Sequence, residues 1–151
     1  QSAVDVFNDK KLPFSVFNGK PTIKPQADIA FLDLPPRTDI TIEGETILIP
    51  MRASVLDMRA VAKSIKLIQH KRIVKCVNAV DTRRQDERLL AMRLYSEGAH
   101  LIKDRSVYSR AISMGKTVFD VDIYGASDAR KEILRLYHSL VNVDPADTTS
   151  K

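Results

Sequence analysis

The sequence contains little cysteine and no long apolar run, and both shortages narrow the class of protein. Cys76 is the only cysteine among 151 residues, so no disulfide framework can form and a reducing compartment, by default the cytoplasm, is expected. No apolar run approaches the roughly 18 residues that a membrane span needs, and no secretory signal pattern opens the chain. The three histidines are scattered without ligand spacing, so they indicate no metal site.

The composition is that of a globular domain. Apolar residues make up 44% and charged residues 28% of the chain, which is typical of a folded protein. A length of 151 residues suffices for one compact domain and is too short for two ordinary ones. We therefore expect a single domain over residues 1–141 and a flexible polar tail over residues 142–151. The net charge of +5 permits weak attraction to nucleic acid, and solubility alone is the alternative explanation.

Short apolar runs alternate with amphipathic stretches, which is typical of an α/β domain with parallel strands. The expected strands are Ile29–Asp33, Thr46–Pro50, Arg72–Val77 and Ala99–Lys103, with a further edge strand at Phe14–Phe17. Helices are expected to begin near Ser54, Thr82, Ser106 and Ser127, the first two with capping boxes. The sequence therefore predicts a three-layer α/β sandwich with a mainly parallel sheet.

Polar side chains follow several of these strands at their carboxyl ends, where open parallel sheets bind ligands. The run Ile-Ala-Phe-Leu before Asp33 has the shape of a Walker B strand, whose terminal carboxylate holds Mg²⁺ beside the phosphates of a nucleotide. An acid that ends an apolar strand and caps a turn is the alternative interpretation. Asn78 and Arg105 follow two later strands.

Four segments carry a resemblance to a known family, in a fixed order. They are Phe31-Leu-Asp33-Leu-Pro35-Pro36, Ile47 to Ala60, Val77-Asn78-Ala-Val-Asp81 and Lys103 to Val118. They resemble, in turn, the D-x-P-P box, the strand and helix after it, the adenine-recognising strand end and the late strand–helix unit of the ParA/MinD family of deviant Walker ATPases. The resemblance runs from residue 1 to about residue 120, and it implies an architecture like that of the P-loop NTPases.

The resemblance implies roles for individual residues. Asp33 is expected to be the catalytic switch carboxylate and to hold Mg²⁺, through a water molecule. Pro35 and Pro36 are expected to stiffen the switch segment beside the nucleotide, because proline fixes φ. Asn78 is expected to hydrogen-bond adenine through its amide donor and acceptor. Arg105 is expected to face either the nucleotide or a partner subunit. An ordinary loop is the alternative for Pro35 and Pro36, and a turn asparagine is the alternative for Asn78.

The resemblance also implies cofactors and partners. ATP and Mg²⁺ are the expected cofactors. The partners are a second copy of the chain, a ParB-type centromere-binding protein and non-specific DNA, with no membrane, in a cytoplasmic protein associated with the nucleoid. Contacts to DNA phosphates are indifferent to base sequence and sensitive to salt. The candidate side chains for such contacts are Arg83, Arg84, Arg88, Arg110, Arg130 and Lys131. A solvated helix face is the alternative for each of them.

Two features depart from the family pattern. The phosphate-binding loop Lys-Gly-Gly-x-Gly-Lys-Thr is not found in this sequence and belongs upstream of Gln1, so we expect no ATP hydrolysis by this stretch alone. Only Arg37 to Glu45 separate the D-x-P-P box from the next strand, whereas a parallel crossover needs about a dozen residues. The family's switch helix is therefore expected to be shortened, deleted or left out of this sequence.

A DNA-partition ATPase is thus the leading functional prediction, and three alternatives remain. A non-catalytic relative could keep the fold to bind DNA or a protein, which the missing loop favours. A MinD-like membrane-cycling ATPase would need a basic, apolar C-terminal helix that Val143–Lys151 does not offer. A flavodoxin-like or receiver domain would need an acidic pocket or flavin loops, and neither is evident.

Overall fold

A computed structural model describes residues 17, 26–33, 46–68 and 72–141. The chain divides into two compact units, Gln1–Arg37 and Thr38–Lys151. In the first unit, residues 26–33 form neither helix nor strand, and the side chains of Ile29, Phe31 and Leu32 are exposed. The strand predicted at Ile29–Asp33 is therefore wrong, because an apolar run becomes a strand only where another strand pairs with its main chain. Phe17 is exposed and outside any strand.

The second unit contains a three-stranded parallel sheet of order β1-β2-β3. The strands are β1 (Thr46–Met51), β2 (Arg72–Val80) and β3 (His100–Lys103). The sequence predicted all three, although β2 runs three residues beyond the predicted end at Val77. Pro50 lies opposite Cys76, which in turn lies opposite His100. The carboxyl ends of the three strands therefore lie at one edge of the sheet.

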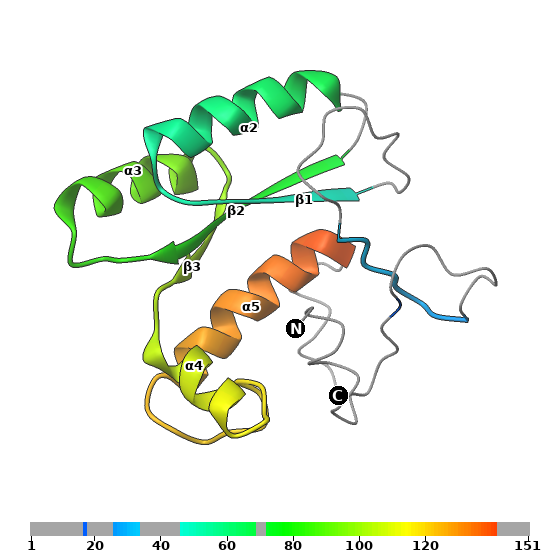
Figure 1. Ribbon diagram of the computed structural model, residues 1–151, viewed down its shortest axis with the longest axis vertical. Coiled ribbons are helices and arrows are strands. Elements are labelled where there is room, and N and C mark those ends of the chain that lie inside the picture. The colour runs from blue at the N-terminus through cyan, green and yellow to red at the C-terminus, as the bar shows by residue number, and fades with distance from the viewer. Residues whose placement is uncertain (1–16, 18–25, 34–45, 69–71, 142–151) are drawn as a thin grey trace. The chain divides into compact units, whose positions relative to one another are not determined.

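Four helices accompany the strands: α2 (Val55–Leu67), α3 (Gln85–Ser96), α4 (Ser106–Ser113) and α5 (Ala126–Val141). Helices α2 and α3 lie on one side of the sheet, and α5 lies on the other side against β3 and β2 (Figure 1). The predicted α/β fold with a parallel sheet is thus confirmed. Within the described ranges, no helix is both long and apolar enough to cross a lipid bilayer.

The predicted cap of α2 is present in part. The Asp57 N–H donates to Ser54 Oγ at 3.1 Å, as a capping box requires. The Asp57 carboxylate accepts instead from the Arg52 N–H at 2.8 Å. This bond joins the residue after β1 to the first turn of α2 and so stabilises the connection between them.

The predicted capping box at Thr82 and Gln85 is wrong. Helix α3 has Arg84 as its N-cap, and that side chain makes no capping hydrogen bond. Asp81 takes over the local bonding: its Oδ1 accepts from the Arg83 N–H at 3.0 Å, and its own N–H donates to Glu87 Oε1 at 2.9 Å. An aspartate that bonds the main chain two residues on forms an Asx turn, and here this turn opens the helix.

Buried apolar side chains form two clusters. The first lies between the sheet and helices α2 and α3, and it consists of Met51, Val77, Val80, Ala91, Leu94 and Ala99. The second joins α4, the loop after it and the start of α5, and it consists of Val107, Ala111, Val118, Val121, Ala126 and Ala129. Helix α5 is also held by arginines at both ends. Arg130 donates to the carbonyls of Val118 and Val121, and Arg72 donates to those of Ser139 and Leu140.

Candidate functional site

A cavity of about 550 Å³ opens where the ends of the three strands meet α4 and α5. We call it the strand-end cavity. Its lining comes from all three strands and both helices: Leu48, Pro50, Cys76, Asn78, Ala79, Ile102, Lys103, Asp104, Arg105, Ser106, Tyr108, Ser109, Ile133 and Leu136. A cavity of this size is within the range of small-molecule and cofactor sites. Its position is also where open parallel sheets bind ligands.

The walls of the cavity are mainly apolar, with a few polar groups among them. The Cys76 thiol, 3% exposed, belongs to the wall. Burial raises its pKa to about 11, so the thiol stays protonated at neutral pH and is a poor nucleophile. Asn78 is the only amide side chain in the lining, and it is exposed.

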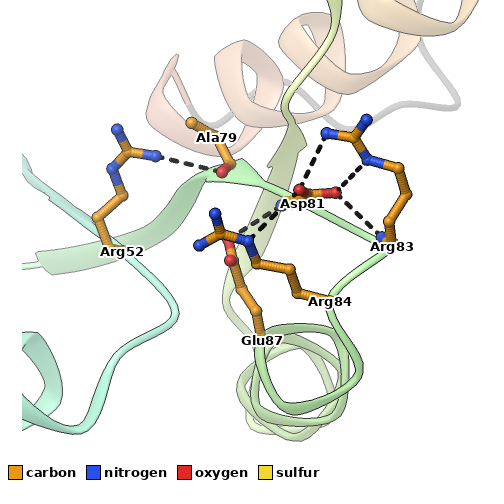
Figure 2. A network of polar contacts seen from close by, with 6 residues as sticks. All are labelled: Arg52, Ala79, Asp81, Arg83, Arg84 and Glu87. Carbon is orange, nitrogen blue, oxygen red and sulfur yellow. Dashed lines mark hydrogen bonds and ion pairs between the residues drawn. The ribbon is translucent and has the colours of Figure 1, made fainter.

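Strand β2 ends irregularly just after Asn78, which lies on the same face as Cys76 by ordinary strand alternation. The pairing of β2 with β3 shifts register between Val77 and Val80, and Ala79 between them has φ of 52°, a left-handed conformation that is unfavourable for a residue with a Cβ. The extra residue lets Val77 and Val80 both join the core beneath α3. The Ala79 carbonyl accepts a 3.3 Å hydrogen bond from Arg52 Nη1, which links the ends of β2 and β1 (Figure 2).

Arg105 stands between β3 and α4 with its charge already matched. Its Nη2 donates to Glu132 Oε1 at 2.8 Å, and its Nη1 lies 3.6 Å from Asp128 Oδ2. Glu132 Oε2 also accepts from the Lys103 N–H at 3.2 Å. The side chains of Arg105 and Glu132 are only 21% and 11% exposed, which strengthens their interaction over that of a surface pair. Glu132 therefore holds the loop after β3 against α5.

A second polar cluster lies at the start of α3 (Figure 2). Arg83 Nε contacts Asp81 Oδ1 at 2.8 Å, and Arg84 Nε lies 3.7 Å from Asp81 Oδ2. The hydrogen bond from the Arg83 side chain is the main reason that the pKa of Asp81 falls to about 2. Asp81 is therefore a structural carboxylate that organises the loop between β2 and α3.

The structure brings two of the sequence-predicted nucleotide residues together. Asn78 and Arg105 come from different strand ends and both line the strand-end cavity. Asp33 is exposed and belongs to the first unit. Its carboxylate is a hard oxygen ligand of the kind that Mg²⁺ prefers. Pro35 and Pro36 lie outside the described residues. Among the described residues, no three histidine, cysteine or acidic side chains gather into a metal-ligand group.

The six basic residues predicted to contact DNA come from three regions. Arg83, Arg84 and Arg88 are exposed around the start of α3, and Arg110 is exposed on α4. Lys131 is exposed on α5, whereas its neighbour Arg130 is half-buried and donates to two loop carbonyls. The guanidinium of Arg130 therefore has a structural partner.

Three features of the site were missed by the sequence reasoning. Tyr108 lines the cavity, and its hydroxyl is buried. Glu132 fixes Arg105, and Ala79 forms the irregular end of β2. A tyrosine two residues into a helix and a glutamate on a helix face carry no sequence signal for these roles. Ala79 carries no such signal either, because alanine has no preference for a positive φ.

The chain matches no protein-family model, no curated protein and no solved structure. Its functional assignment therefore depends on the geometry of the site and on the motifs in its sequence.

Proposed function

We propose that this chain is the nucleotide-binding α/β core of a ParA-type partition ATPase, which acts in plasmid or chromosome segregation. One observation carries the proposal: Asn78 and Arg105, taken from separate strand ends, line one cavity at the ligand-binding edge of a parallel sheet. The motif resemblance implies that Asn78 contacts adenine and that Arg105 faces either the nucleotide or a partner subunit. The fold alone would allow many other ligands.

In this proposal each side chain has a separate role. Asn78 hydrogen-bonds the edge of adenine with one donor and one acceptor. The motif resemblance further implies that Asp33 would hold Mg²⁺. Arg105 positions the loop between β3 and α4 at the cavity, because Glu132 and Asp128 on α5 hold its guanidinium. The phosphate-binding loop of the ParA family is not found in this sequence.

The proposed cellular role follows from the same family of proteins. ATP binding supports a homodimer that binds DNA without sequence preference in the cytoplasm, on the nucleoid, and a ParB-type centromere-binding protein triggers release. The proposed phosphate contacts come from exposed arginines around the start of α3, namely Arg83, Arg84 and Arg88. Arg83 and Arg84 also form ion pairs with Asp81.

Calorimetric titration with a non-hydrolysable ATP analogue, with and without Mg²⁺, tests the nucleotide part. We expect saturable binding that Asn78→Ala weakens about 10-fold, because a lost pair of hydrogen bonds to a base costs on the order of 1–2 kcal/mol. Gln85→Ala removes an exposed amide at the start of α3 and serves as the matched control. Asp33→Ala should remove the dependence on Mg²⁺ while Asp122→Ala, another exposed carboxylate, retains it.

A non-catalytic module that binds DNA or a protein is the second candidate. The observation in its favour is that the cavity's arginine is already paired with two carboxylates, which leaves little positive charge for phosphates. Absence of analogue binding by the wild-type chain would reject the nucleotide proposal. Binding to duplex DNA that weakens steeply with salt, and without nucleotide, would then support the second candidate.

A further inference from the structure

Helix α2 presents a row of cations to solvent. Arg59, Lys63 and Lys66 are spaced i, i+4 and i+7, and all three are exposed, so they lie along one side of the helix. The opposite side of α2 carries Met58 and Val61, which pack against the core cluster between the helix and the sheet. We call Arg59, Lys63 and Lys66 the α2 basic stripe. It extends over about 10 Å of the helix.

The charge of the α2 basic stripe is not offset by the carboxylates that the structure describes. None of these carboxylates forms an ion pair with its three side chains. Asp57 is the one acidic residue of α2, and its carboxylate accepts a hydrogen bond from the Arg52 N–H. Like charges one turn apart, such as those of Arg59 and Lys63, destabilise a helix. Helix stability alone therefore does not explain the row.

The arginines around the start of α3 have a different environment. Arg83 Nε and Arg84 Nε lie 2.8 and 3.7 Å from carboxylate oxygens of Asp81. The first turn of α3 adds two more acidic residues, Asp86 and Glu87. Helices α2 and α3 cover the same side of the sheet (Figure 1), and of these two, α2 offers the more uniformly positive surface to a polyanion.

The side chains within the α2 basic stripe favour nucleic acid over a membrane or a protein. A helix that lies on a bilayer needs large apolar residues beside its cations, and a protein interface is usually centred on aromatic or large apolar side chains. The exposed apolar residues within the stripe are only Ala60 and Ala62, while Val55 and Leu56 precede it in the first turn. Duplex DNA carries one negative charge per about 1.7 Å of its axis, so a straight row of cations meets phosphates along its whole length.

We propose that the α2 basic stripe is a contact surface for duplex DNA, which lies along α2 and is held through its phosphates. The inference rests on the proposed function for the identity of the partner, and it places that partner on a helix that the sequence reasoning did not select. Helices α2 and α5 lie on opposite sides of the sheet (Figure 1). DNA along α2 therefore leaves the strand-end cavity open to a nucleotide.

The test measures binding of a short labelled duplex to the full chain by fluorescence anisotropy over a series of salt concentrations, with the ATP analogue and Mg²⁺ present. The test variant combines Arg59→Gln with Lys63→Gln, since glutamine has nearly the same helix propensity as lysine and arginine. Lys66 is kept, because a cation in the last turn favours the helix dipole. The control combines Lys116→Gln with Arg135→Gln, which removes the same amount of charge from exposed positions outside α2.

The wild type should bind two duplexes of unrelated base sequence with equal affinity, because phosphate contacts carry no base information. Each phosphate contact contributes about 0.9 to the slope of log affinity against log salt. The test variant should therefore lower the slope by about 2 and weaken binding at low salt by about 10-fold, whereas the control should change the slope by less than about 0.5. The melting temperature of the test variant should stay unchanged or rise, because a like-charge pair is removed, which separates lost binding from lost folding.

Each of three other results rejects the inference. If the test variant and the control lose affinity equally, net charge alone attracts DNA and α2 is no particular contact surface. If the test variant keeps the wild-type slope, DNA lies on another surface, while the DNA part of the proposed function stands. If the wild type binds neither duplex, the inference and the DNA part of the proposed function fail together; binding of anionic phospholipid vesicles or of polyglutamate that the test variant loses would then assign the stripe to a different partner.

Discussion

The two faces of the sheet differ in how completely they are covered. On the side of α2 and α3, Val77, Val80 and Leu94 are almost entirely buried in one continuous cluster. On the side of α5, Leu48 remains 36% exposed and Pro50 is exposed beside a cavity. Parallel sheets usually have both faces covered. The difference indicates that the first face stabilises the fold and the second is available to a ligand.

The backbone shows the same division. The short link from β1 to α2 is regular and is closed by the cap at Ser54. The end of β2 changes register and contains the left-handed Ala79. Departures from regular geometry therefore collect at the cavity, which is the pattern expected where function rather than stability selects the conformation.

Truncating one leucine on each face should show the largest difference. Leu94→Ala leaves a hole in the closed cluster, and we expect it to lower the free energy of unfolding by about 2–5 kcal/mol. Leu136→Ala removes a half-buried side chain from the cavity wall and should cost about 1 kcal/mol, because water already reaches that surface. Urea unfolding of both variants measures the difference. Equal losses would show that the two faces contribute alike.

Breaking the ion pair at the cavity should have the next largest effect. Glu132→Gln removes the charge that Arg105 faces, and we expect a loss of about 2 kcal/mol in the free energy of unfolding, since both side chains are largely buried. Glu97→Gln breaks the exposed pair with Arg93 and should cost less than about 0.5 kcal/mol. Denaturant unfolding of the two variants provides the measurement. A loss at Glu132 as small as that at Glu97 would mean that α5 does not depend on this pair.

Relieving the backbone at Ala79 should give a smaller effect of opposite sign. Ala79→Gly removes the Cβ that disfavours a φ of 52°, a gain of about 1–2 kcal/mol. The more flexible unfolded chain offsets about 0.4–1 kcal/mol of it. We expect a net stabilisation of roughly 0.5 kcal/mol in urea unfolding. Ala60→Gly, at an exposed position within α2, is the control and should destabilise by about 1 kcal/mol. Destabilisation by both variants would contradict strain at Ala79.

The smallest expected effect concerns the carboxyl group of Asp81. Its pKa in the folded protein, about 2, lies below the ordinary value of 3.8. The unfolded chain therefore binds the proton more tightly, so this group's contribution to stability is present above about pH 4 and is lost as the pH falls toward 2. The carboxyl chemical shift of Asp81 should titrate near pH 2. Arg83→Ala should raise that midpoint toward 3.8, whereas Arg110→Ala should not. An unchanged midpoint in Arg83→Ala would show that another group lowers the pKa.

Local patterns predicted much of the second unit. The apolar runs around Leu48, Val74 and Ile102 identified the three strands, and the helices between them followed from amphipathic spacing. Gly98 follows the C-cap residue of α3 and has φ of 89°, a conformation that glycine adopts without a steric penalty. These features depend on residues close in sequence, so sequence patterns reveal them.

The failures of prediction have a common physical cause. Residues 29–33 have the composition of a strand, but a strand also needs a neighbour to pair with, and their sequence does not specify one. Thr82 was expected to cap α3, yet the Asp81 carboxylate bonds the Arg83 N–H instead. In both cases a competing or missing contact decided the conformation.

The sequence by itself determined the alternation of strands and helices, their parallel order, and which polar residues would follow the strands. Tertiary structure decided how those strand ends are used. The register shift near Ala79 lets Val77 and Val80 share one core, Glu132 reaches back 27 residues to hold Arg105, and the hydroxyl of Tyr108 is buried with no partner among the described residues. Such contacts join segments far apart in the chain, and they form only once the helices have packed on the sheet.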